Sequence, residues 1–194
     1  LSFDYVGTVT FGITANLLGM EVPIRSNFSW GGQATGIDER TVEAFGENFP
    51  GAAAPTVNSA SITQGFEVRQ KIWNSGFFFQ NVFDIADKYF LTVGTRVDGN
   101  SAFGKGFGLQ VYPKASASWI LSDESFYPDI GEMKLRAAFG RSGRAPGAFD
   151  AVRTWSPVGL AGNPAFVPEN VGNDAVGPEV TEELEYGFDA SWWD

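Results

Sequence analysis

Long stretches of this chain alternate between apolar and polar residues with a period of two. The segment DKYFLTVGTRVDGNSAFGKGFGLQVYPKASASW, residues 87–119, shows the pattern on both sides of a glycine-rich break. Tyr89, Leu91, Val93 and Val97 fall in one row. The alternate row is polar and contains Thr92, Gly94, Arg96 and Asp98. Because successive side chains of a β-strand point to opposite faces, the pattern predicts strands with one apolar and one polar face.

The same alternation recurs along the whole chain and predicts about seven strands of ~10 or more residues. They cover residues 1–17, 24–35, 62–83, 89–98, 109–121, 133–141 and 180–193. The phase of the third run slips near Trp73–Gly76, which predicts a β-bulge there. One helical turn is expected within residues 123–129, and no helix of useful length. The sequence therefore predicts an all-β, antiparallel fold.

The breaks between these runs differ in length. Residues 19–23, 84–88 and 122–132 are expected to be turns, whereas 36–61, 99–108 and 142–178 are expected to be irregular loops, two of them long. Outer-membrane barrels have short periplasmic turns and longer extracellular loops. Strand directions then alternate consistently, with the three irregular loops outside the cell.

The amino-acid composition excludes or disfavours several classes of protein. Hydrophobic residues make up 43% of the 194 residues and charged residues 19%, which argues against disorder. The formal net charge of −10 disfavours nucleic-acid binding, which needs a basic footprint. The chain has no Cys and no His, which excludes disulfides, thiolate catalysis and the usual zinc and haem ligands. No run of about 18 apolar residues predicts a transmembrane helix.

An antiparallel sandwich would show the same alternation, with its apolar rows facing inward. Three features favour a transmembrane β-barrel. The runs are longer than the usual five or six residues, and the polar rows hold Gly, Ser, Thr and charges of both signs, as in a water-filled lumen. Aromatic residues also gather beside the short turns, as in a membrane-interface girdle. These girdle candidates are Phe83, Tyr89, Trp119 and Trp192.

Four blocks resemble a known family: DKYFLTVGTRVDGNSAFG, VYPKASASWILSDESF, MKLRAAFGRSG and PEVTEELEYGFDASWWD. In order and spacing they look like the C-terminal barrel of TonB-dependent outer-membrane transporters of the SusC/RagA type, most strongly over residues 77–194. The resemblance implies a plugged barrel of ~22 strands. It also implies TonB-driven import of bulky nutrients, such as oligosaccharides or peptides, beneath a SusD-like surface lipoprotein. Residues 1–194 are then expected to be a partial barrel domain, roughly a third of the wall, without plug or remaining strands.

Candidate functional residues follow from this arrangement. Polar residues expected to face the lumen are Arg96, Asp98, Lys114, Arg136, Glu183 and Glu185. Phe149, Trp155 and Phe166, in the 142–178 loop, are candidates for contact with a ligand or with the lid lipoprotein. The expected partners are TonB, the SusD-like lipoprotein, outer-membrane lipid and a nutrient ligand, with no nucleic acid.

No catalytic residue, metal ligand or cofactor site is expected. Ser142 has no histidine to activate it, and the GKGFG stretch at residues 104–108 lacks the context of a phosphate loop. Asp98 begins a calcium-like pattern, but Leu109 stands where a bidentate Glu would bind. A loop entry is therefore the preferred interpretation, with a structural calcium as the alternative.

Three hypotheses for function result. The first is a fragment of an active outer-membrane nutrient importer. The second is a passive porin or autotransporter-like barrel, in which lumen charges alone set selectivity. The third is a soluble secreted β-sandwich for carbohydrate binding or adhesion.

Overall fold

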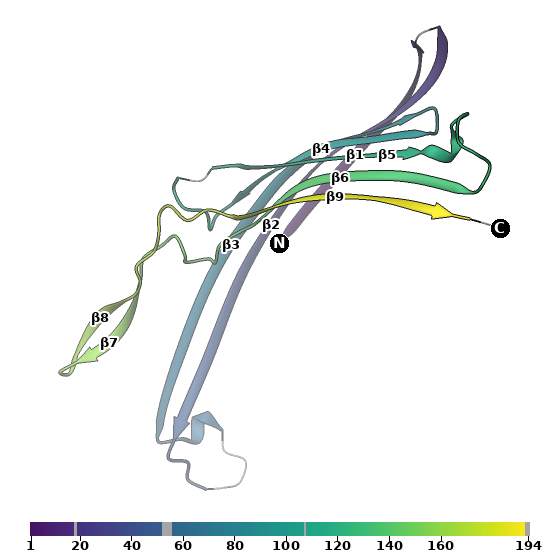
Figure 1. Ribbon diagram of the computed structural model, residues 1–194. Coiled ribbons are helices and arrows are strands. Elements are labelled where there is room, and N and C mark those ends of the chain that lie inside the picture. Colours follow the sequence, from purple (N-terminus) through teal and green to yellow (C-terminus); the bar gives the residue numbers. More distant parts are fainter. Residues whose placement is uncertain (18, 52–55, 107, 193–194) are drawn as a thin grey trace.

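The computed structural model describes residues 1–17, 19–51, 56–106 and 108–192 and consists almost entirely of β-strands (Figure 1). The strands are β1 (Ser2–Leu17), β2 (Met20–Glu47), β3 (Ile62–Ile85), β4 (Tyr89–Asn100), β5 (Gln110–Ile120), β6 (Glu132–Arg144), β7 (Thr154–Leu160), β8 (Asn163–Asn170) and β9 (Glu179–Ser191). Two 3₁₀ turns are η1 (Val57–Ser59) and η2 (Leu121–Asp123). Among the described residues, no helix has the length and hydrophobicity needed to cross a membrane.

The long strands form one seven-stranded sheet in the order β1-β2-β3-β4-β5-β6-β9. Each strand pairs antiparallel with the one before it, so the sheet is a meander whose edges are β1 and β9. β7 and β8 form a separate hairpin that projects from one end of the sheet (Figure 1). The prediction of an all-β meander of about seven long strands is therefore confirmed.

The register brings the apolar rows of all seven strands onto one face of the sheet. One line of directly paired residues crosses the sheet as Ile13, Ile24, Ile85, Tyr89, Trp119, Leu135 and Phe188. The next line on the same face is Phe11, Ser26, Phe83, Leu91, Ala117, Ala137 and Tyr186. We call this the apolar face and the opposite side the polar face.

The apolar face is not covered by any other part of the described chain. Ala102 is the only fully buried hydrophobic residue, and Ser26 the only buried polar one, in the part of the chain that the structure describes. Leu91 is 40% and Leu184 70% exposed. A soluble sandwich would bury these leucines under a second layer, so the sandwich hypothesis is wrong. An apolar surface of this extent requires a lipid or protein environment.

β2 is longer than the sequence analysis expected. The interpretation of residues 36–61 as irregular is wrong for 36–47, which continue β2, and residues 20–23 also belong to the strand rather than to a break. The bulge expected near Trp73 is absent, because β2 and β3 pair without a shift from Ile24↔Ile85 to Glu47↔Ile62.

The phase slip has a different cause. β1 and β4 stop pairing with β2 and β3 at Thr35 and Asn74. Residues 36–47 and 62–73 therefore continue as a two-stranded ribbon, which we call the β2–β3 extension (Figure 1). Along the extension the apolar row moves to the other side of the ribbon, and charged residues continue the line of the apolar face. The apolar and polar rows exchange sides because the neighbouring strands end where the sheet narrows. The pairing of β2 with β3 itself continues without a break.

The expected alternation of short and long connections holds only in part. Short turns join β1 to β2 and β3 to β4, and long connections join β2 to β3 and β6 to β9 at the other end of the sheet. The β5–β6 connection, residues 121–131, is however slightly longer than the β4–β5 connection, residues 101–109. The β3–β4 turn places Ala86 and Asp87 at φ of 56° and 57°, the left-handed conformation of a tight hairpin. The long loop predicted for 142–178 is shorter, since β6 runs to Arg144 and β7 and β8 lie within it. The helical turn expected within 123–129 is only the 3₁₀ turn η2.

Candidate substrate-facing surface

The polar face carries an arginine–carboxylate pair near the end of the sheet with long connections. Arg96 and Asp98 lie two residues apart on β4 and therefore on the same face. Arg96 Nε donates to both carboxylate oxygens of Asp98, at 2.7 and 2.9 Å. Arg96 Nη2 also donates to Gln33 Oε1 at 3.2 Å, which links β4 to β2. These bonds hold the two side chains in place and leave their other donor and acceptor groups on the polar face.

A hollow surrounds this pair, with a cavity volume of about 370 Å³. Its lining includes Gln33, Arg96, Asp98, Asn100 and Tyr112, and we call it the polar hollow. A neighbouring cavity of about 440 Å³ shares the Arg96, Asp98 and Tyr112 side chains and adds those of Lys114 and Phe78. Together the two cavities offer charged, amide, hydroxyl and aromatic groups, the mixture that a bulky polar ligand requires.

Two glycines allow these side chains to lie flat against the wall. A Cβ at Gly76 would stand 1.9 Å from Asp98 Oδ1, and one at Gly143 would stand 2.0 Å from Tyr112 Oη. Any larger residue at either position would push the carboxylate or the ring out into the hollow. Gly76, Gly143 and Tyr112 cannot be selected from sequence alone, because each contact joins two different strands and depends on their register.

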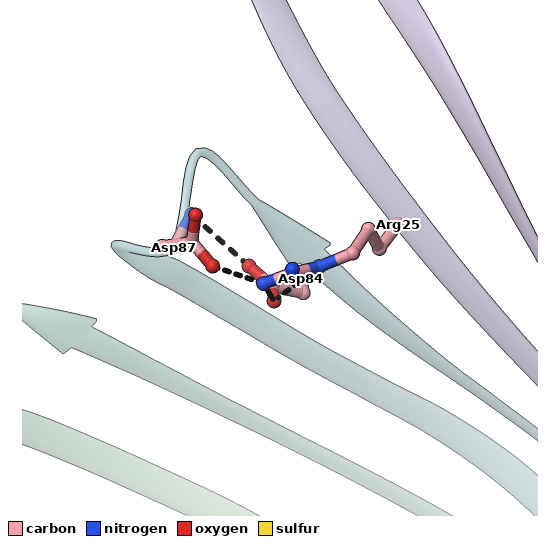
Figure 2. A network of polar contacts seen from close by, with 3 residues as sticks. All are labelled: Arg25, Asp84 and Asp87. Atoms are coloured by element: carbon pink, nitrogen blue, oxygen red, sulfur yellow. Dashed lines mark hydrogen bonds and ion pairs between the residues drawn. The ribbon is translucent and has the colours of Figure 1, made fainter.

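The other end of the polar face holds a three-residue charge network (Figure 2). Arg25 on β2 lies directly opposite Asp84 on β3, and its Nε and Nη2 donate to Asp84 Oδ2 at 3.1 and 2.6 Å. The same guanidinium contacts Asp87 in the β3–β4 turn, and the Asp87 backbone N–H donates to Asp84 Oδ1 at 3.1 Å. The network ties the tight turn to β2. The sequence analysis missed it because Arg25 and Asp84 are 59 residues apart.

The remaining lumen candidates also lie on the polar face. Arg136 on β6 stands 3.7 Å from Glu185 and 4.0 Å from Asp189, both on β9. Lys114 and Glu183 make no ion pair within the described residues. Arg136 is 52% and Glu185 60% exposed, so their pair adds little to stability. We therefore regard these charges as available to a ligand or to another protein surface.

The three loop aromatics lie in the connection between β6 and β9. Trp155 on β7 and Phe166 on β8 share one face of the hairpin, since Trp155 pairs with Pro168 and Phe166 with Pro157. They are 51% and 70% exposed. Phe149 lies in the turn before β7, 41% exposed, and its carbonyl accepts a bond of 2.8 Å from Asn170 Nδ2. Two of the three candidates are therefore brought together, and Phe149 stands apart from them.

Two of the four girdle candidates, Tyr89 and Trp119, contact one carboxylate. The Tyr89 and Trp119 rings are stacked with centroids 5.9 Å apart. Glu124, in the β5–β6 turn, accepts hydrogen bonds from Tyr89 Oη and, at 3.1 Å, from Trp119 Nε1. These two bonds and the Lys88 ammonium 3.8 Å away hold the pKa of Glu124 below its ordinary value. The cluster connects the β3–β4 turn to the β5–β6 turn, next to the row of the apolar face that contains Tyr89 and Trp119.

Phe83 lies on the apolar face one row further in, opposite Leu91. Trp192 follows β9, 58% exposed, with its ring beside Gly131. The membrane depth of all four girdle candidates stays a prediction.

The calcium-like stretch has its oxygen atoms engaged otherwise. The Asp98 carboxylate is bound by Arg96, and Asn100 Oδ1 accepts the Ala102 backbone N–H at 2.7 Å. Asn100 also bonds to Asn74 on β3. These contacts agree with a loop entry stabilised by its own side chains.

Comparison with known proteins adds a family and a fold. The family described as TonB dependent receptor-like, beta-barrel matches residues 2–194. TonB-dependent receptor P26 of Formosa agariphila is 36% identical over 118 residues, and TonB-dependent receptor P39 of the same organism is 32% identical over 115. These alignments cover 59% and 56% of this chain and 11% of each relative, so the chain spans about a tenth of their length.

Solved structures of similar shape belong to the RagAB system. The RagAB peptide importer in its closed-closed state aligns over 99% of this chain and 22% of that chain, with a TM-score of 0.77 and 12% identity. The importer in its open-open state aligns with a TM-score of 0.62 and 10% identity, over 99% of this chain and 25% of that one. The seven-stranded sheet thus has the fold of part of these β-barrels.

Proposed function

Because this chain belongs to the TonB-dependent receptor-like β-barrel family and lies in the bacterial outer membrane, we propose that it forms part of the wall of an active importer. The cargo is a bulky nutrient, an oligosaccharide or a peptide. The resemblance to SusC/RagA-type transporters is confirmed as a matter of family and fold.

One observation carries the proposal: the register holds seven apolar rows on one uncovered face and the charged and hydroxyl-bearing rows on the other. In a bilayer, backbone groups pair within the sheet and apolar side chains meet lipid, whereas polar side chains need water. This division supports a wall with lipid on one side and an aqueous path on the other.

The polar hollow and its neighbour suit a cargo that is polar and large. Arg96, Asp98 and Gln33 offer donors and acceptors, and Tyr112 and Phe78 offer apolar surface for a sugar ring or a peptide side chain. Nothing in this arrangement requires covalent chemistry. Transport then depends on binding from the outside and on release driven from elsewhere in the protein.

The expected partners follow from the same proposal. TonB supplies the energy through a part of the protein outside these residues, and a SusD-like lipoprotein covers the extracellular side. The neighbours of similar fold are named as the RagAB peptide importer and the RagAB peptide transporter, which supports a SusC/RagA-like assembly of this kind. The Trp155–Phe166 face of the hairpin is our candidate for contact with cargo or lid, because a two-stranded hairpin exposing apolar residues is marginally stable alone.

Uptake measured with and without the energy source tests the proposal. The full-length protein would be expressed in its outer membrane, and cells would receive labelled oligosaccharide or labelled peptide pools. We expect uptake of one cargo class, and we expect deletion of TonB to reduce it to background while surface binding remains. Removal of the lipoprotein should lower uptake at limiting cargo.

A passive porin gives the opposite result, because diffusion through an open lumen needs no energy. Uptake that continues at the same rate without TonB, and that falls off steeply with cargo size, would support the passive barrel and reject the importer.

A further inference from the structure

The β2–β3 extension begins where the apolar face ends, and an aromatic residue lies at that point. Trp73, opposite Gly36, is the last aromatic residue of the lipid-facing row on β3, and its ring lies over Gly36. Residues 73–85 of β3 span ~40 Å at ~3.3 Å per residue, or about 30 Å of height at a strand tilt of ~40°. That height matches an apolar band with an aromatic girdle at each edge. Trp73 therefore marks the outer edge of the hydrocarbon layer.

Charged residues follow directly on the same face of the ribbon. Because pairing continues without a bulge, the rows Asp38↔Lys71, Arg40↔Arg69 and Val42↔Glu67 extend the line of Trp73. Lys71 and Arg69 stand two and four residues beyond Trp73, which places them about 5–10 Å higher. This is the depth of the lipid headgroups.

These side chains form an exposed basic cluster. Arg40 and Arg69 are directly opposite each other, an unfavourable pairing of like charges. Glu67 lies between them, 2.8 Å from Arg40 Nη2 and in contact with Arg69 Nε. Both arginines remain more than half exposed, at 57% and 65%. Lys71 Nζ lies 5.8 Å from the Trp73 ring centroid and makes no ion pair in the described part of the chain.

The two faces of the extension differ in the sign of their charge. All the basic residues of the ribbon, Arg40, Arg69 and Lys71, lie on the lipid side. The lipid side also carries Asp38 and Glu67, so its formal charge is +1. The other side carries Glu39, Glu43 and Glu47 and no basic residue, a formal charge of −3. In a chain with a net charge of −10, this separation gives an outward surface that attracts anions and an inward surface that repels them.

We propose that Arg40, Arg69 and Lys71 bind the phosphate groups of an outer-leaflet lipid. Arg40 and Arg69 each use one guanidinium nitrogen on Glu67, which offsets their mutual repulsion, and their other N–H groups can donate to phosphate oxygens. Lys71 adds a point charge at the edge of the hydrocarbon. The lipid would hold the base of the extension at the membrane surface, which is a role separate from cargo transport.

Lipid retention by the full-length protein tests this assignment. Purified protein would be placed in phosphatidylcholine nanodiscs containing increasing fractions of diphosphoryl lipid A, and retained lipid would be counted by native mass spectrometry. We expect the triple variant Arg40→Gln, Arg69→Gln, Lys71→Gln to need about 10- to 100-fold more lipid for the same occupancy, since each cation near an anionic surface contributes measurably. A single Arg69→Lys change should retain most of the binding.

A matched variant separates a site from general charge. Lys105→Gln, Arg144→Gln, Arg153→Gln removes the same charge from exposed positions in two connections and at the end of β6, and it should bind lipid as the wild type does. Equal losses in both triple variants would overturn the proposal.

Two further comparisons identify the ligand. Fully dephosphorylated lipid A with the same acyl chains should not be retained; if it is, binding depends on the acyl chains and the proposal is wrong. Inorganic phosphate at millimolar concentration should not displace the lipid, and displacement would assign the cluster to free anions instead. A β-sheet circular dichroism spectrum identical to that of the wild type shows that the variants are folded.

Discussion

At the scale of single residues, the Glu124 carboxylate contacts the side chains of Tyr89, Trp119 and Lys88. Its pKa is lowered, first by the Tyr89 and then by the Trp119 hydrogen bond. A carboxylate whose pKa is lower in the folded chain stabilises the fold above the pKa of the unfolded state. That contribution disappears as the pH falls through the lowered folded-state pKa.

We therefore expect Glu124→Gln to lower the thermal unfolding midpoint of the full-length protein at pH 7. The difference from the wild type should shrink towards zero at a pH well below 4, where both side chains are neutral. Differential scanning calorimetry in detergent at several pH values measures this. Asp123→Asn, which removes the same charge one residue earlier, is the control and should show a smaller effect at pH 7. A pH-independent difference for Glu124→Gln would contradict the assignment.

At the scale of elements, the molecule combines a broad sheet with two narrow two-stranded projections. The β2–β3 extension and the β7–β8 hairpin each pair only within themselves. Such ribbons gain little stability alone, so their exposed side chains are free to serve contacts outside the chain. The extension carries its basic residues on the side that we propose faces lipid, whereas the hairpin presents aromatics and prolines.

For the hairpin we expect Trp155→Ala with Phe166→Ala to weaken binding of cargo or lid by about tenfold or more, as loss of central aromatic contacts does. The thermal midpoint of the barrel should change little, because the hairpin forms a sheet of its own. Val158→Ala, on the opposite face of β7, is the matched control. Isothermal titration with cargo and co-purification with the lipoprotein measure the effect. If the control and the double variant bind equally, the aromatic face has no role in contact.

At the scale of the whole molecule, the sheet has almost no interior of its own. Its stability therefore depends on what contacts the apolar face. Two neighbouring positions on β9 should differ for this reason. Leu184 lies on the apolar face in line with Phe139, and Glu183 lies on the polar face opposite Gly140.

Substitution by arginine should lower the free energy of unfolding by different amounts at these two positions. Leu184→Arg places a charge against lipid and should destabilise the full-length barrel by about 2–4 kcal/mol near the midplane. Glu183→Arg faces water and should cost about 1 kcal/mol or less. Reversible unfolding in urea in the presence of lipid vesicles measures both values. Similar costs at the two positions would show that the apolar face does not meet lipid.

Much of the fold could be predicted because the period-two pattern is local. Each strand contacts an apolar medium on one side and water on the other. The residue type at each position therefore indicates which face it lies on, without information from other strands. Most of the seven strands of the large sheet, the all-β class and the separation of Leu91, Leu135 and Leu184 from Arg96, Arg136 and Glu183 therefore follow from the chain alone, whereas the β7–β8 hairpin does not. The face shared by Arg96 and Asp98 follows in the same way.

Only the tertiary structure decided how far pairing continues and which distant groups meet. The run of β2 beyond Thr35 looked irregular because its apolar row changes sides, and only unbroken pairing with β3 shows it to be strand. The contacts of Arg25 with Asp84, of Arg96 with Gln33 and of Tyr112 with Gly143 join separate strands. Register sets these contacts, and register depends on the pairing of whole strands rather than on the residues of any one of them.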